Sequence, residues 1–174
     1  MIRYLKYKLI IVVDVLYVIK KSNKIRIKKG QILQRAGENN SRIYIVKSGL
    51  LRSYMIDEKG KEHIFLFASE NWVMTDSTAK NTPCKLFIDA IEDSEVNILE
   101  KGKEDKIELQ KILNRLETLQ NRILMMMHST ALERYNHFTK TYPKIIQRVP
   151  QRMIASYLGI TPEALSKVKR ESRK

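Results

Sequence analysis

The sequence predicts an α+β chain in which an antiparallel β-rich part precedes one long helix and a small helical domain. Short segments of β character, separated by turn signals, recur at intervals of about 8–12 residues between residues 24 and 99. After Glu100 the apolar spacing changes to a helical period, and a helix-turn-helix pattern follows near the C-terminus. We therefore expect a β-domain over residues 1–100, a long helix over 101–130 and a helical domain over 131–174.

The β-rich part is predicted from runs of β-branched and aromatic residues bounded by glycine and polar turns. The expected extended segments are residues 24–28, 31–35, 43–46, 50–56, 63–67, 86–91 and 96–99. The connections between most of them are short enough for hairpins, whereas parallel strands need crossovers of about a dozen residues or more. The pattern therefore favours an antiparallel sandwich or barrel over a doubly wound parallel sheet.

The long helix is predicted from apolar residues that alternate between spacings of three and four. These residues are Leu109, Ile112, Leu116, Leu119, Ile123 and Met126. No proline or glycine interrupts residues 104–128, so one continuous helix is expected there. A seam this narrow favours pairing with a second copy of the helix in a dimer, and the alternative is an ordinary helix packed on its own β-domain.

The C-terminal domain is predicted to hold two short helices joined by a sharp turn. A preceding helix over residues 131–142 ends before Pro143. Val149-Pro150 is expected to open the first short helix, with proline in its first turn and with an inner face made of Ile154, Ala155 and Leu158. Gly159 is expected to supply the turn, so the pattern indicates a helix-turn-helix.

The second short helix has clear start signals and a basic outward face. Thr161 is expected to be its N-cap, Pro162 its first residue, and Glu163 a first-turn acid near the positive end of the helix dipole. Leu165 and Val168 form the expected inner face. The residues expected to point outward are Ser166, Lys167, Lys169 and Arg170. This face favours DNA as the partner, and the alternative is a small helical subdomain with a solvated basic face.

The charge distribution also points to a polyanion. The formal net charge is +14, and residues 1–35 carry +9 and residues 136–174 carry +7, whereas residues 41–100 carry −3. A negatively charged partner such as double-stranded DNA is therefore expected to bind at an end of the chain. A lysine-rich surface that only increases solubility is the alternative.

Several classes of protein are disfavoured by composition. The single cysteine, Cys84, allows no disulfide within the chain, and His63, His128 and His137 lack the spacing of metal ligands, so no metal site is expected. One histidine in the β-rich part also argues against an enzyme of the cupin kind. The apolar run 9–19 is too short for a membrane span of about 20 residues, and we expect a buried helix or strand there in a cytoplasmic protein.

Stretches along most of the chain resemble the Crp/Fnr family of transcription regulators. Residues 28–33, with the sequence Lys28-Lys29-Gly30-Gln31-Ile32-Leu33, and Ala36-Gly37-Glu38 are similar to the family's entry into its β-roll, and residues 43–49 to its next strand and turn. The similarity to a subgroup common in Bacteroidetes-type bacteria lies in residues 133–135, 142–143, 148–151 and 154–166. The resemblance covers about residues 24–170 and implies a double-stranded β-helix of the cyclic-nucleotide-binding kind, followed by a dimerisation helix and a helix-turn-helix.

The resemblance also implies which residues meet DNA. Glu163 and Lys167 match positions of the recognition helix that touch base edges; Glu can accept from cytosine N4, and Lys can donate to guanine O6 and N7. Other residues in the two helices would contact phosphates, which position the protein without reading sequence. The expected DNA-binding residues are Gln151, Arg152, Thr161, Glu163, Ser166, Lys167, Lys169 and Arg170.

The chain departs from the cyclic-AMP-binding members of the family where they hold their ligand. Those members carry a Gly-Glu pair and, further on, an Arg followed by Ser or Thr, for which the corresponding stretches here are residues 71–78 and 83–87. No arginine occurs there, Asp76 would repel a phosphate, and Lys85 could substitute only in part. We therefore expect no cyclic AMP and either another small effector or none, with a candidate pocket of Trp72, Met74, Thr75, Asp76, Lys85 and Phe87.

These observations predict a non-enzymatic, homodimeric transcription regulator in which the β-roll senses an unknown effector and the helix 161–170 enters the major groove. RNA polymerase is a further expected partner, and no membrane is involved. Two alternatives stay open: a ligand-binding regulatory module whose helical tail docks on a protein, and a degenerate regulator without an effector.

Overall fold

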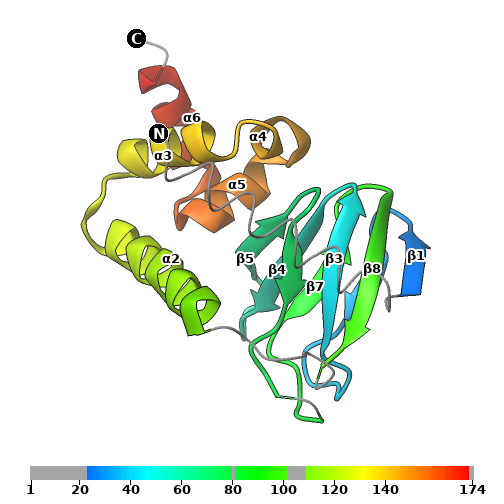
Figure 1. The fold of residues 1–174 in the computed structure, drawn as a ribbon. Coiled ribbons are helices and arrows are strands. Elements are labelled where there is room, and N and C mark those ends of the chain that lie inside the picture. The colour runs from blue at the N-terminus through cyan, green and yellow to red at the C-terminus, as the bar shows by residue number, and fades with distance from the viewer. Residues whose placement is uncertain (1–22, 80, 102–108, 173–174) are drawn as a thin grey trace. The chain divides into compact units, whose positions relative to one another are not determined.

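The computed structural model describes residues 23–79, 81–101 and 109–172 (Figure 1). The chain forms two compact units, of which the first comprises residues 1–55 and 67–103 and the second residues 56–66 and 104–174. The apolar run predicted at residues 9–19 lies outside the described residues. The predicted division of the helical part at residue 130 stays a prediction.

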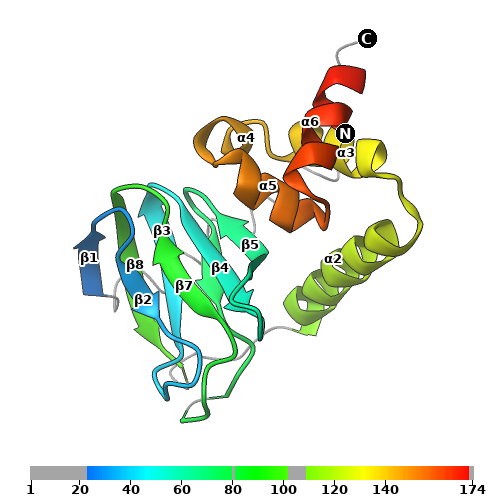
Figure 2. The ribbon, with the colours of Figure 1, turned by 180° about the vertical axis from the view of Figure 1, so that it is seen from behind.

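Two four-stranded sheets form the β-rich part, and the antiparallel architecture predicted from the sequence is confirmed (Figures 1 and 2). In spatial order, the first sheet consists of β1 (Asn23–Ile27), β8 (Ser94–Glu100), β3 (Arg42–Ser48) and β6 (Val73–Thr75). The second consists of β2 (Ile32–Gln34), β7 (Phe87–Ala90), β4 (Leu51–Ile56) and β5 (Glu62–Ala68). Apart from the consecutive strands β4 and β5, the strands that neighbour one another are not consecutive in sequence, as expected for a β-roll.

The central strands bury runs of consecutive residues in the roll. Tyr44 and Val46 of β3 are buried, and Val46 lies opposite Val96 of β8 in the register of the first sheet. In the second sheet Ser53 lies opposite Ile88, and both are buried. On the other face of these strands the Arg52 guanidinium forms a two-pronged ion pair with the Asp89 carboxylate, at 2.8 and 2.9 Å. Burial of both charges is tolerated because each satisfies the other.

The turn between β3 and β4 requires glycine. Gly49 has φ +90°, and a Cβ atom there would lie 2.1 Å from the Ser94 hydroxyl oxygen. That hydroxyl instead accepts a hydrogen bond from the Leu50 N–H at 3.1 Å. The close approach of the two backbones is therefore possible only because position 49 has no side chain.

Two short elements were not predicted from the sequence. Strand β6 covers three residues and pairs with β3, and the turn before it places Asn71 at φ +68°, a conformation that asparagine tolerates better than most residues. Helix α4 (Ile145–Arg148) occupies the connection after Pro143. Both elements have too few residues to show a periodic pattern of apolar residues that could be recognised in the sequence.

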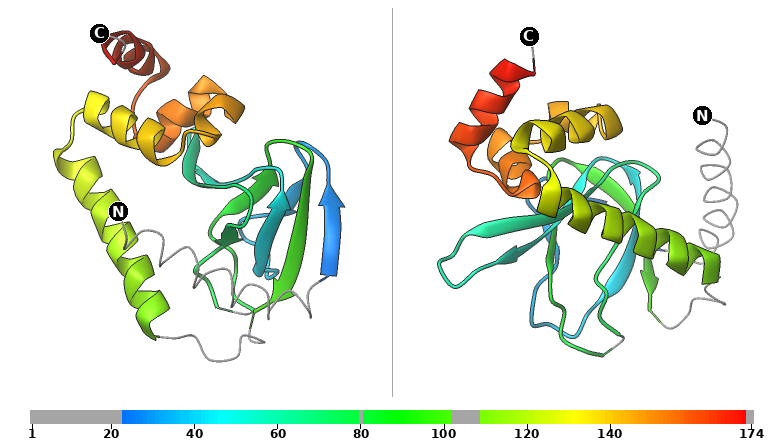
Figure 3. Two further views of the ribbon diagram at one scale, coloured as in Figure 1. Left: turned by 45° about the horizontal axis from the view of Figure 1, so that its top comes forward. Right: turned by 90° about the vertical axis from the view of Figure 1, so that its left-hand side faces the viewer.

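The helical elements agree with the remaining predictions. The helices are α2 (Leu109–His128), α3 (Ala131–Thr141), α5 (Gln151–Leu158) and α6 (Pro162–Glu171), which can be followed in two further views in Figure 3. The predicted start of the long helix, residues 104–108, lies outside the described residues. A reciprocal capping box between Thr130 and Glu133 begins α3. No helix among the described residues has both the length and the hydropathy that a membrane span requires.

Candidate functional site

Helices α5 and α6 pack on α3 through the apolar faces that the sequence predicts. Ile154, Ala155 and Leu158 of α5 are buried, and so are Leu165 and Val168 of α6. The Phe138 ring of α3 lies 5.1 Å from the Tyr157 ring of α5, in a tilted arrangement that is favourable for aromatic pairs. This core fixes α6 with one face inward and the other exposed.

The turn between α5 and α6 is made by Gly159. Its φ of +67° is left-handed, and a Cβ atom there would lie 2.6 Å from Cε of Met126. The Arg134 guanidinium donates to the carbonyl oxygen of Leu158 at 2.7 Å, which satisfies one acceptor at the C-terminus of α5. The expectation that glycine supplies a sharp turn is therefore confirmed, and it reflects both backbone conformation and space.

The start of α6 has the predicted chemistry. The Thr161 hydroxyl accepts a hydrogen bond from the Ala164 N–H at 3.2 Å, and Pro162 occupies the first turn. Hydrogen bonds from the backbone N–H of Glu163 itself and from Thr161 lower the pKa of Glu163, so this side chain is a carboxylate at neutral pH. The sequence predicts Pro150 in the first turn of α5. The structure corrects this prediction, because Pro150 is the N-cap of α5 and the helix begins at Gln151.

The outward face of α6 is polar and exposed. The exposed residues of this face are Glu163, Ser166, Lys167 and Arg170, and Lys169 is half-buried. The Lys169 ammonium donates to Oε1 of Gln151 at 3.0 Å, which joins the two helices at their polar edges. Arg152 is exposed beside Gln151 at the start of α5. We call the set Gln151, Arg152, Lys167, Lys169 and Arg170 the basic ridge.

Ser166 plays a local role within this face. Its hydroxyl donates to the carbonyl oxygen of Pro162 one turn earlier, at 3.0 Å. The side chain is exposed, so the hydroxyl oxygen keeps an acceptor lone pair that faces outward. The structure thus brings together the predicted residues of α6 and the first two residues of α5.

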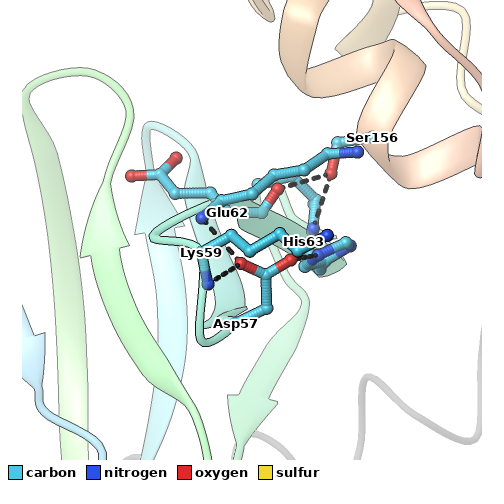
Figure 4. Close-up of polar contacts among 7 residues, drawn as sticks. Asp57, Lys59, Glu62, His63 and Ser156 are labelled. Carbon is cyan, nitrogen blue, oxygen red and sulfur yellow. Dashed lines mark hydrogen bonds and ion pairs between the residues drawn. The ribbon is translucent and has the colours of Figure 1, made fainter.

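A contact that the sequence did not predict joins α5 to residues 56–66, the tip of the β4–β5 hairpin (Figure 4). The Ser156 hydroxyl accepts from the Ile64 N–H at 2.9 Å and donates to the Glu62 carbonyl oxygen at 3.0 Å. The Arg122 guanidinium of α2 donates to the Phe65 carbonyl oxygen and lies 4.3 Å from the centre of the Tyr157 ring. The tip, α2 and α5 are therefore joined within the second unit.

The tip itself is ordered around Asp57. Its Oδ1 accepts from the Lys59 and Lys61 N–H groups at 3.0 and 2.9 Å, and its Oδ2 lies 2.7 Å from Nε2 of His63. The hydrogen bond with His63 is the largest cause that lowers the pKa of Asp57, followed by that with the Lys61 N–H. The carboxylate thus closes the turn and orients the strand edge that meets Ser156.

Helix α2 exposes an apolar band in the single chain. Of the predicted seam, Leu119 is half-buried, whereas Ile123 is 59% exposed and Met126 37% exposed. The side chains of Leu109, Ile112 and Leu116 lie outside the described residues. Leu124 and Met127, which are outside the seam, are also exposed, so the apolar band is wider than the predicted seam.

The residues of the candidate effector pocket differ in burial and in their contacts, and the pocket stays a prediction. Met74 is buried opposite Tyr44 of β3, whereas Thr75 is exposed and its hydroxyl donates to the Arg42 carbonyl oxygen at 3.0 Å. Phe87 stacks on Tyr54 with 5.3 Å between ring centres. The Trp72 carbonyl accepts from the Val46 N–H at the start of β6.

Asp76 and Lys85 do come together, through the backbone of Lys85. The buried Asp76 carboxylate accepts from the Lys85 N–H at 2.6 Å, while the Lys85 side chain is exposed. Sequence reasoning placed Asp76 in the pocket as a charge facing a ligand, and it missed the backbone partners. No local sequence signal identifies these partners, because neither the burial of Asp76 nor its contact with the Lys85 and Leu86 N–H groups can be read from the sequence.

Known proteins are similar to this chain in sequence and in fold. The "Cyclic nucleotide-binding domain" family matches residues 24–107. An anaerobic regulatory protein from Aggregatibacter actinomycetemcomitans is 28% identical, in a match that covers 82% of this chain and 63% of the relative. A fumarate and nitrate reduction regulatory protein from Vibrio cholerae is 29% identical, with 82% and 65% covered. The chain thus spans less than two thirds of the length of these relatives.

Solved structures share the fold. FixK2 from Bradyrhizobium japonicum superimposes with a TM-score of 0.72 at 21% identity, over 86% of this chain and 83% of the other. A transcriptional regulator of the CRP/FNR family from Thermus thermophilus gives a TM-score of 0.63 at 17% identity, over 86% and 84%. Both similarities cover the β-rich part and helices, which supports the architecture described above.

Proposed function

We propose that the chain is a DNA-binding transcription regulator of the Crp/Fnr family whose helix α6 enters the major groove. The single observation that carries this proposal is the basic ridge on α5 and α6, whose residues are exposed except for the half-buried Lys169, while Leu165 and Val168 on the opposite face of α6 are buried. The relatives named above are regulatory proteins. The more specific placement in a Bacteroidetes-type subgroup stays a prediction.

The chemistry of the ridge fits a duplex. A recognition helix presents residues of its N-terminal part to base edges, and Glu163, Ser166 and Lys167 lie within the first six residues of α6 in exposed positions. Lys169, Arg170, Gln151 and Arg152 lie further back or on the neighbouring helix, where contacts with phosphates would position the head. In this assignment Thr161 caps the helix and adds a contact with the backbone of the DNA.

A dimer would place two such helices on one face of DNA. We propose that the seam from Leu109 to Met126 pairs with the same seam of a second copy, since Ile123 and Met126 are exposed in the single chain. Two heads about 34 Å apart would then meet successive major grooves. A regulator of this kind would act in the bacterial cytoplasm, and RNA polymerase is its expected protein partner.

The decisive experiment is selection of bound sequences from random double-stranded DNA with the full chain. A two-fold symmetric site with half-sites one helical turn apart is the expected result, because it follows from paired recognition helices. The matched control is Lys144→Ala, which removes one exposed positive charge of the second unit outside the ridge. It should select the same sequence with little loss of affinity.

Salt titration distinguishes DNA binding from the alternative of a protein-docking tail. Affinity for DNA should fall steeply as salt increases, since each phosphate contact releases counterions. If the selection enriches no sequence and the chain binds DNA no more tightly than the double variant Lys167→Ala/Arg170→Ala does, the proposal is wrong. The docking module or a degenerate regulator would then be the better hypothesis.

A further inference from the structure

The two stretches that correspond to the ligand-holding segments of cyclic-AMP-binding members bind each other in this chain. Asp76 belongs to the stretch 71–78, and Lys85 and Leu86 belong to the stretch 83–87. Oδ2 of Asp76 accepts from the Lys85 N–H at 2.6 Å and from the Leu86 N–H at 2.9 Å. Adjacent backbone N–H groups that converge in this way form an anion site, and here a side chain of the protein itself fills it.

The rest of the surroundings of Asp76 also match an anion. Its Oδ1 accepts from the Thr78 N–H at 2.9 Å, and the Gln34 amide nitrogen lies 3.5 Å from Oδ2. The Lys101 ammonium donates to the main-chain carbonyls of Asp76 and Thr78 at 2.5 and 2.6 Å, which adds a positive charge beside the loop. The residue is only 2% exposed. The carboxylate is therefore enclosed by donors on several sides.

The protonation state agrees with this environment. Burial alone would raise the pKa of Asp76, but the hydrogen bonds from the Thr78, Leu86 and Lys85 N–H groups together lower it below its ordinary value. Asp76 is thus ionised at neutral pH. No arginine occurs between residues 71 and 87 to offset a second negative charge.

These residues do not fit a cyclic nucleotide, although the matching family is named for that ligand. We propose that Asp76 is an internal anion that occupies the phosphate-type site of the β-roll, so that the roll is fixed in one conformation without an anionic effector. A cyclic phosphate would have to displace a buried carboxylate from its N–H groups or lie beside it, and both are unfavourable.

The first test uses the unaltered full chain. Isothermal titration with cyclic AMP should give no saturable heat at millimolar nucleotide, and the melting temperature should not change. Hydrogen exchange should show the Thr78, Lys85 and Leu86 amides protected when no anion has been added. Saturable binding of one cyclic AMP per chain, or exchange of these amides at the rate of exposed ones, would overturn the proposal.

The second test is rescue by an external anion. Asp76→Ala opens a small space lined by three N–H groups, so formate, and to a smaller extent inorganic phosphate, should raise its melting temperature in a concentration-dependent way. The matched control is Asp93→Ala, which removes an exposed carboxylate that accepts from the Lys29 N–H at 2.9 Å. It should gain no more from formate than the unaltered chain does.

Failure of the rescue has a defined meaning. If Asp76→Ala folds and formate stabilises it no more than it stabilises Asp93→Ala, Asp76 does not fill an anion site and the proposal is wrong. If Asp76→Ala does not fold, the titration and the hydrogen exchange on the unaltered chain decide the matter. Neither test involves DNA, so their outcome is independent of the proposed function.

Discussion

The Ser156 hydroxyl accepts a hydrogen bond from the Ile64 N–H at 2.9 Å, across 92 residues of sequence (Figure 4). The same hydroxyl donates to the Glu62 carbonyl oxygen at 3.0 Å, so one side chain of α5 satisfies both polar groups of a strand edge. The neighbours of Ser156 on α5, Ala155 and Tyr157, are buried. Ser156 is thus the polar link between the tip 56–66 and the helix that precedes α6.

Ser156→Ala should destabilise the second unit by about 1–3 kcal/mol, because the Ile64 N–H and the Glu62 carbonyl lose their partner together. Urea denaturation followed by circular dichroism measures the change. The control is Ser172→Ala, which removes one exposed hydrogen bond, to Oδ1 of Asn136, and should cost about 0.5 kcal/mol or less. Equal effects of the two substitutions would show that the contact with the tip contributes nothing of its own.

Gly159→Ala should destabilise the chain by about 1–2 kcal/mol, because alanine is strained in the left-handed backbone conformation at this position. Steric crowding should add to this cost, because the new Cβ atom would lie 2.6 Å from Cε of Met126. Gly37→Ala is the control, because Gly37 has φ +89° but no atom within 4 Å of its Cβ position. In the double variant Gly159→Ala/Met126→Ala the extra cost should disappear. If it persists, the crowding is not caused by Met126.

The helix-turn-helix formed by α5 and α6 could be predicted from the sequence because its signals are local. Gly159, Thr161 and Pro162 each act within one turn of their own position, and the structure places them as a turn, a cap and a first-turn residue. The β-branched and aromatic runs of the long strands are likewise local signals. Strand β6 escaped prediction because its three residues are too few to show a period.

The role of Asp76 and the contact of Ser156 could not be predicted because both depend on how separate segments fold onto each other. The Asp76 carboxylate binds the Lys85 and Leu86 N–H groups, nine and ten residues further along the chain, and Ser156 meets Ile64 across 92 residues. The sequence does reveal that Asp76 is an unusual residue for a phosphate site, yet only the fold shows which N–H groups it binds. The side chains of Leu109, Ile112 and Leu116 lie outside the described residues, so their place in the dimer seam stays a prediction.

Acid should reduce the contribution of Asp76 to stability. Its pKa in the folded protein is lowered from the ordinary value of 3.8, so its hydrogen bonds contribute fully above pH 3.8 and are lost as the pH falls through the lower folded value. The free energy of unfolding of the unaltered chain should therefore exceed that of Asp76→Asn most at neutral pH. The difference should shrink as the pH decreases below about 4.

Denaturation in urea at a series of pH values between 7 and 3 measures this difference. Glu58→Gln, at an exposed position of the β4–β5 hairpin, is the control and should leave the profile nearly unchanged. A difference between the unaltered chain and Asp76→Asn that stays constant down to pH 3 would argue that the carboxylate is not held in its ionised form.

Ile123→Glu should dissociate the proposed dimer, since a carboxylate buried in an apolar seam lacks a partner. The dissociation constant should increase by at least about tenfold, for a cost of about 1.4 kcal/mol or more. Sedimentation velocity over a range of protein concentrations measures it. Met127→Glu is the matched control, because Met127 is 78% exposed and lies outside the seam. If Met127→Glu dissociates the chain as strongly, the contact surface is the wider apolar band and not the predicted seam.

Lys167→Ala and Lys169→Ala should affect DNA binding in different ways, although each removes one positive charge from α6. Lys167 is exposed near the middle of the helix, and we propose that it reaches a base edge, so its loss should relax the preference at one base pair by about 1–3 kcal/mol. Lys169 is held by Gln151 at the edge of the ridge. Its loss should weaken binding to all DNA sequences alike and reduce the slope of log K against log salt by about 0.9.

Fluorescence anisotropy with the selected site and its single-base variants, at several salt concentrations, separates the two effects. A uniform loss for both variants would mean that α6 lies along the phosphate backbone and does not read the groove.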